Sequence, residues 1–178
     1  MNIKNQQTTA FEKYAVVFLC AILLAPWLYI QPKMSINSDS AWLYLCAEHI
    51  LSGNSLIQSC FDPNPPMSMM IYMPMVMISH LTGMENYITI IITSSLLILF
   101  GLYTTNETLK DHDYLTKNDR ICMVFAYLCT ITIITSLNFS EREHYIAILS
   151  LPYIINGLSI TKGKQSDKIL TIALSVLA

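Results

Sequence analysis

The residues of this chain that could do chemistry stand in two short polar stretches, each at the edge of an apolar segment. The first contains Asp39, which follows the first apolar segment and opens a pattern typical of an amphipathic helix. A carboxylate in that place could act as a general base or as a metal ligand just above a membrane. It could equally be a capping or first-turn acid, which stabilises a helix by about 0.3–1 kcal/mol. Both interpretations of Asp39 stay open on the sequence alone.

The second stretch, residues 139–144, places ionisable side chains between two segments that lack charge. They are Glu141, Arg142, Glu143 and His144. Such a group could form a second acidic site that binds a metal or a donor molecule carrying phosphate. A structural reading fits equally well, because Ser140 and Glu143 have the spacing of a capping box for a helix beginning near Tyr145. The two readings are compatible, and His144 alone is no metal signature.

Five segments without Asp, Glu, Lys or Arg must position these stretches, at 14–30, 67–79, 87–105, 121–137 and 145–160. Charged residues make up 12% of the chain, about half the share of a soluble domain, so the composition favours a membrane protein. A helix needs ~20 mostly apolar residues to cross the bilayer. The sequence therefore predicts an all-α, polytopic membrane protein with about five spanning or near-spanning helices. A sixth apolar run, at 169–178, is too short to cross.

Residues 31–66 are predicted to form an outer loop that contains an interfacial amphipathic helix. Its apolar residues recur at helical spacing and are Trp42, Leu43, Cys46, Ala47, Ile50 and Leu51. Gly53 stands where a helix C-cap belongs, and the prolines of 61–66 predict a rigid turn into the next helix. Cys46 and Cys60 could pair in an oxidising compartment or serve as buried packing residues.

The basic residues predict which parts of the chain face outward. Lys4 and Lys13 precede the first apolar segment, so the positive-inside bias puts the N-terminus in the cytoplasm and the first loop outside. The same bias puts residues 106–120 in the cytoplasm and residues 138–144 outside. Strict alternation of full spans predicts the opposite for both loops. We favour the charge bias, because the run at 67–79 is short for a full span.

Several features follow one another in a characteristic order. They are Asp39 after the first segment, Ala47-x-x-Ile-Leu-x-Gly53, Asp-Pro-Asn-Pro-Pro at 62–66, Thr82-Gly83, and Phe-Ser-Glu-Arg-Glu-His at 139–144 followed by Leu-Pro-Tyr at 151–153. Over residues 38–83 and 138–153 this order resembles the N-terminal part of C-type-fold membrane glycosyltransferases, which include protein O-mannosyltransferases and aminoarabinose transferases. The stretch 139–144 is similar to a Phe-Gly-Gln-Arg-Glu-His motif of bacterial relatives, with Ser140 and Glu141 in place of glycine and glutamine.

The resemblance implies transfer of a sugar from a polyprenyl-phosphate donor to an acceptor at the outer face of a bacterial inner membrane. In that family the first-loop acid, here Asp39, acts as the base or near the metal, and a second acid, here Glu143 or Glu141, assists it. Asp39 and Glu143 are therefore the candidate catalytic residues and the candidate ligands of a divalent cation, Mg²⁺ or Mn²⁺. Glu141, Arg142 and His144 are the candidate substrate-binding residues. The implied partners are membrane lipids and the lipid-linked donor.

Other classes of function fit the chain less well, with one exception. A net charge of −2 without a basic stripe argues against nucleic acid. A transporter or flippase would carry ionisable residues inside its spans, whereas here they lie outside. A structural or assembly subunit needs only helices and caps and remains the alternative. We read residues 1–178 as one membrane-embedded helical region, the N-terminal part of a longer protein, and expect the isolated chain to be inactive.

Overall fold

The computed structural model describes residues 18, 21–22, 24–34, 36–60, 66–110, 112, 115–135 and 138–161. Within these residues the chain is helical and contains no strand, as the all-α prediction requires. The predicted turn at 61–65, the sixth apolar run and most of the first apolar segment lie outside the described residues.

The described chain forms a series of helices, most of them short. Residues 24–30 are helical and lead into η1 (Gln31–Lys33). The later elements are α2 (Ser38–Leu51), α3 (Leu56–Ser59), α4 (Pro66–Met70), α5 (Met73–Thr82), α6 (Asn86–Lys110), α7 (Lys117–Cys129), the π-helix η2 (Thr130–Ile134) and α8 (Arg142–Thr161).

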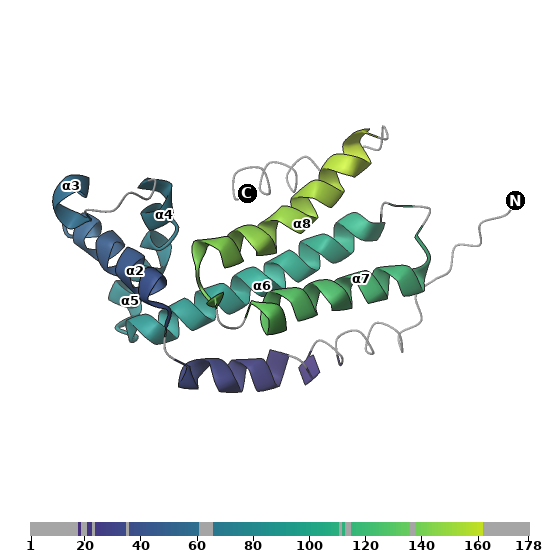
Figure 1. Ribbon diagram of the computed structural model, residues 1–178, viewed down its shortest axis with the longest axis horizontal. Coiled ribbons are helices and arrows are strands. Elements are labelled where there is room, and N and C mark those ends of the chain that lie inside the picture. The colour runs from purple at the N-terminus through teal and green to yellow at the C-terminus, as the bar shows by residue number, and fades with distance from the viewer. Residues whose placement is uncertain are drawn as a thin grey trace, which may run out of the picture.

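The long helices form a bundle, and the short ones gather at one end of it. Helices α6, α7 and α8 lie side by side, with α6 in contact with both others, and α2 to α5 form a compact group where α6 begins (Figure 1). Helix α7 runs back toward that end, and α8 starts from it. Both polar stretches singled out in the sequence therefore lie at the same end of the molecule.

The prediction of about five membrane-spanning helices is wrong, because only α6 among the described helices is long and apolar enough to cross a membrane. The run at 67–79 is broken at residues 71–72 into α4 and α5, and Pro74 stands in the first turn of α5. Helix α7 ends after 13 residues and continues as the π-helix η2. The first turn of helix α8 contains two charged residues, Arg142 and Glu143. This finding overturns the polytopic, multi-pass prediction.

The helix predicted in the first loop is α2, although its faces differ from the prediction. It ends at Leu51 with Ser52 as its C-cap, and Gly53 follows with a φ of +92°, a conformation that favours glycine. Tyr44 is buried, whereas Trp42, expected on the apolar face, is 47% exposed. Cys46 and Cys60 form a disulfide whose Cα atoms lie 5.3 Å apart. The bridge ties the middle of α2 to the residue that ends α3.

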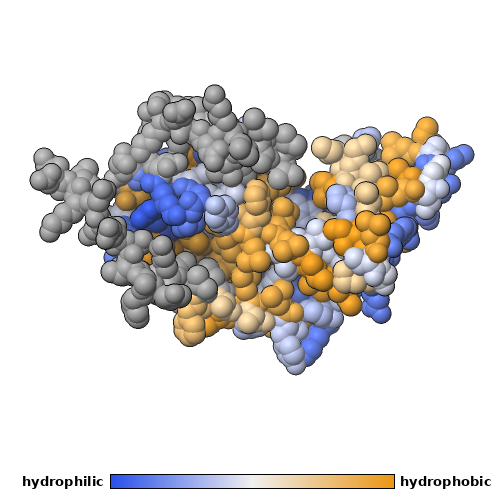
Figure 2. Space-filling view, turned by 180° about the vertical axis from the view of Figure 1, so that it is seen from behind, coloured by the Kyte–Doolittle hydropathy of each residue, from blue (hydrophilic) through white to orange (hydrophobic). Residues whose placement is uncertain are grey.

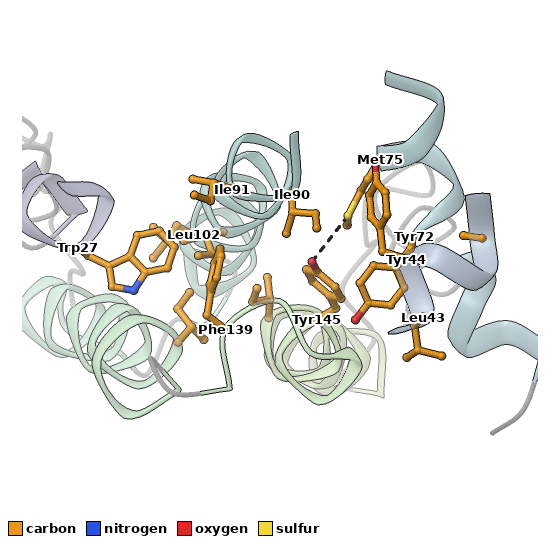
Figure 3. Packing of buried hydrophobic residues seen from close by; sticks show 14 of the residues in the cluster. Trp27, Leu43, Tyr44, Tyr72, Met75, Ile90, Ile91, Leu102, Phe139 and Tyr145 are labelled. Atoms are coloured by element: carbon orange, nitrogen blue, oxygen red, sulfur yellow. Dashed lines mark hydrogen bonds between the residues drawn. The ribbon is translucent and has the colours of Figure 1, made fainter. Parts of the chain in front are cut away.

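One continuous core joins the end group to the bundle. Figure 3 shows Tyr72 and Met75 of the end group beside Tyr145 of α8. The rings of Tyr72 and Tyr145 meet edge to face with centroids 6.0 Å apart, and Trp27 packs in the same way on Phe139 at 5.0 Å. Because these contacts cross between elements, the start of α8 is held in a fixed place against the α2–α5 group.

Candidate functional site

Asp39 lies in the first turn of α2, at the end of the molecule where α8 also starts. The helix is capped by Asn37, whose Oδ1 accepts a hydrogen bond from the backbone N–H of Asp39 at 2.9 Å. The Asp39 side chain is exposed. Capping is therefore the role of Asn37, and the Asp39 carboxylate adds only a helix-dipole contribution of about 0.3–1 kcal/mol. Its carboxylate is left accessible for chemistry.

The second polar stretch forms a tight turn that leads into α8. The backbone N–H of Glu141 donates to the Asn138 carbonyl at 3.2 Å, and Ser140 has a φ of +64°, which is uncommon for a residue with a side chain. Helix α8 begins at Arg142, so Ser140 lies before the helix instead of capping it. The predicted capping box of Ser140 and Glu143 is therefore wrong. The Ser140 hydroxyl is buried and makes no hydrogen bond within the described residues.

Arg142 links the start of α8 to α4. Its Nε donates to Oε1 of Glu143 at 2.6 Å, and its Nη1 donates to Oγ of Ser68 at 3.4 Å. The hydrogen bond from Arg142 holds the pKa of the Glu143 carboxyl below its usual range. Because Glu143 is 59% exposed, this ion pair contributes little to stability. Its effect is to keep Glu143 charged and beside a guanidinium.

His144 is placed differently from the other candidates, because its ring is buried. Only 1% of the residue is exposed. Its Nδ1 accepts a hydrogen bond from the Ser140 backbone N–H at 3.3 Å, and its Nε2 lies 2.8 Å from the Ile131 carbonyl oxygen. Burial lowers the pKa of the imidazole, and the bond to Ile131 opposes that shift. His144 thus contacts the protein backbone on both sides.

Tyr72 is a site residue that the sequence analysis missed. It stands between α4 and α5, is fully buried, and donates from its hydroxyl to the Ser140 carbonyl at 2.7 Å. Burial raises the pKa of Tyr72 to about 12; the Ser40 hydroxyl opposes this shift, and the charges of Glu141 and Glu143 add to it. Tyr72 therefore lies between the first turn of α2 and the turn before α8. The only sequence signal was its position as the sole aromatic residue in the run at 67–79.

The structure brings Asp39 close to Glu141, which lies about a hundred residues later in the sequence. The pKa of the Glu141 carboxyl is raised, first by partial burial and then by the negative charges of Glu143 and Asp39. Of the three acids, Glu143 is held charged by Arg142, whereas Glu141 is the one that its surroundings favour in the protonated form. A carboxylate with a raised pKa takes up a proton more readily than an ordinary glutamate, which is a property of general bases.

The described residues contain no group of three or more His, Cys, Asp and Glu side chains placed to hold a metal ion. Mg²⁺ is often held by one or two carboxylates together with the phosphate oxygens of a substrate. The predicted ligands are Asp39 and Glu143, and the charges of both act on Glu141. The divalent cation therefore stays a prediction, which depends on a phosphate-bearing ligand to complete the coordination.

Comparison of the chain with protein-family models, curated proteins and solved structures finds no match. The resemblance to C-type-fold glycosyltransferases therefore rests on the ordered motifs alone, and its consequences for function remain predictions.

Proposed function

We propose that the end of the molecule built from the starts of α2 and α8 is the reaction site of a membrane-surface glycosyltransferase, which takes a sugar from a polyprenyl-phosphate donor. The observation that carries the proposal is the approach of Asp39 to Glu141 beside Tyr72. In a protein without catalysis, two acids so far apart in sequence have no reason to lie at the same end of the molecule. In a transfer site they must lie together, because they act on the same substrate.

In the proposed reaction, an acceptor hydroxyl oxygen forms a bond to the anomeric carbon of the donor sugar. The bond from that carbon to the phosphate oxygen breaks, and its electron pair leaves with polyprenyl phosphate. Asp39 or Glu141 takes the hydroxyl proton as general base. The guanidinium of Arg142 binds Glu143 and acts electrostatically on Glu141, and it supplies positive charge suited to the phosphate. His144 binds the turn rather than the substrate.

A membrane location is supported by the exposed face of α6. Five large hydrophobic residues recur along it at spacings of three or four, which keeps them on one side of the helix. They are Ile88, Ile92, Leu96, Leu99 and Tyr103. Figure 2 shows hydrophobic side chains covering a broad part of one face of the molecule. An apolar surface of this kind suits contact with lipid.

The orientation is supported by the cysteines and the basic residues. Disulfides persist in oxidising compartments, so the Cys46–Cys60 bridge favours a non-cytoplasmic location for the α2–α5 end. Lys110 and Lys117 lie at the opposite end of the bundle, at the end of α6 and the start of α7. The positive-inside bias favours the cytoplasm for that end. Both signals agree with a reaction site on the outer face.

The test is a donor-dependent transfer assay on the Asp39→Asn variant, with the protein at its full natural length. Asparagine keeps the size of the side chain and removes the base, and loss of a general base costs about 10²–10⁴-fold in rate. The matched control is Glu48→Gln, which removes another acid of α2. The Oε1 of Glu48 lies 3.6 Å from Nε2 of His80. We expect normal membrane abundance for both variants and a large loss of turnover only for Asp39→Asn. Wild-type turnover of Asp39→Asn would show that Asp39 is not the base. Absence of transfer by the unaltered full-length protein would favour the assembly-subunit alternative.

A further inference from the structure

The ring of His144 joins two backbone segments through its two nitrogens. On one side is the turn before α8, through the Ser140 N–H, and on the other is η2, through the Ile131 carbonyl. These two contacts fix the proton positions of the ring. A carbonyl oxygen can only accept, so Nε2 carries the hydrogen, and Nδ1 must be unprotonated because it accepts from Ser140.

The Ile131 carbonyl accepts this bond because it lies at the carboxyl end of the α7–η2 helix. Carbonyl groups in the last turn of a helix have no following N–H in the helix to accept from, so side chains often satisfy them. Here Oγ1 of Thr135 donates to Ile131 at 2.8 Å, and Nε2 of His144 donates at the same distance. The ring thus caps one helix while it binds the turn that starts the next.

The turn held by His144 carries the charged groups of the proposed site. Glu141 is its last residue, and Arg142 is the first residue of α8. Other contacts of the turn include the hydrogen bond from the Tyr72 hydroxyl to the Ser140 carbonyl and the ring of Phe139, whose centroid lies 5.6 Å from that of the His144 ring. The Ser140 N–H donates to Nδ1 of His144, and Ser140 itself has a φ of +64°, which is uncommon for a residue with a side chain.

We infer that His144 is a positioning residue of this site: by binding the Ser140 N–H and the Ile131 carbonyl at once, it fixes Glu141 and Arg142 relative to Asp39. The effect of this geometry on turnover rests on the proposed function. The effect of His144 on the position of Glu141 is independent of that function, so it can be measured whether or not the protein transfers a sugar.

Two conservative variants separate the two bonds of the ring. In His144→Asn, the amide oxygen can stand where Nδ1 stood and accept from Ser140, but nothing reaches Ile131. In His144→Gln, the amide nitrogen can stand where Nε2 stood and donate to Ile131, but the Ser140 N–H loses its acceptor. If His144 only filled space, the two variants would change the surroundings of Glu141 to a similar extent. If it only stabilised the end of α7, His144→Asn would have the larger effect, because it loses the bond to Ile131.

The principal measurement is labelling of carboxylates with a carbodiimide and an amine, quantified by mass spectrometry. We expect His144→Gln to change the labelling rate of Glu141 several-fold, while Glu48 and Glu107 in the same molecule keep their wild-type rates. His144→Asn keeps the bond to Ser140 and loses only the bond to Ile131, so it should change the Glu141 rate less than His144→Gln does. Equal Glu141 rates in wild type and His144→Gln, or a change of the same size in both variants, would overturn the inference.

A measurement on the unaltered protein keeps the test decisive even if both variants fold poorly. In ¹⁵N-histidine spectra, His144 must be neutral with hydrogen on Nε2, and hydrogen on Nδ1 would refute the assignment. In the transfer assay, His144→Gln should lower kcat by about 10- to 100-fold at unchanged KM, because a misplaced group loses transition-state interactions. If the full-length wild type transfers no sugar while Glu141 labelling behaves as expected, the proposed function fails and the positioning role stands.

Discussion

Removing the Cys46–Cys60 disulfide should destabilise the end group that carries Asp39. The two cysteines are 14 residues apart, and a closed loop of about 15 residues corresponds to ~3 kcal/mol of lost chain entropy in the unfolded state. Both cysteines are buried, so alanine is the suitable replacement because it leaves no hydroxyl without a partner. We expect the Cys46→Ala/Cys60→Ala pair to lower the free energy of unfolding by up to about 3 kcal/mol.

The location of the bridge decides which part of the molecule loosens. Cys46 lies in the middle of α2, seven residues after Asp39, and α2 packs against α4 and α5. Without the bridge, the α2–α3 segment should open before the bundle does, because the bundle keeps all its own contacts. Hydrogen exchange should therefore speed up first in α2 and α3, with α6 and α8 little changed.

The assay is chemical unfolding of the alanine pair against wild type, with Cys122→Ala as the control. Cys122 is exposed and unpaired, so its replacement should leave the midpoint unchanged. Maleimide labelling of the native protein without reductant should leave Cys46 and Cys60 unmodified. Free thiols at these positions, or an unchanged unfolding midpoint in the alanine pair, would refute the reasoning from loop closure.

Two further predictions test the packing and the orientation of the bundle. A Cβ on Gly101 would lie 2.6 Å from the Tyr127 hydroxyl and 2.8 Å from Cγ2 of Ile148, so Gly101→Ala should destabilise the contacts of α6 with α7 and α8 by about 1–3 kcal/mol; an unchanged unfolding midpoint would contradict this. In intact cells, Glu143→Cys, made with the disulfide kept and all other cysteines replaced, should react with an impermeant maleimide. If the introduced cysteine reacts only after the cells are permeabilised, the site does not lie on the outer face and the prediction is wrong.

Local patterns in the sequence determined the helices and the residues worth testing. The spacing of apolar residues and the glycine at 53 located α2 within residues 31–66, because helix formation and capping depend on neighbours within one turn. The polar stretches at 39 and 139–144 stood out because charge is rare in this chain. The all-helical class of the described residues followed from the same patterns.

The number of possible spans could not be read from hydropathy, because an apolar run does not show where its helix breaks. The run at 67–79 has a composition suited to lipid, yet it turns at residues 71–72 and packs on α2. That break places Tyr72 under the turn before α8. Pairing of Cys46 with Cys60 was also left open by the sequence, since an apolar helix face suits both burial and a bridge.

The site itself was decided by tertiary structure. Sequence could propose Asp39 and the acids near residue 141, but their approach depends on packing between elements a hundred residues apart. The family resemblance implied substrate contact for His144, whereas the fold buries its ring between two backbone groups. Side-chain chemistry is a local property that the sequence records directly. Which atoms meet depends on long-range packing, and that information appears only when the chain is folded.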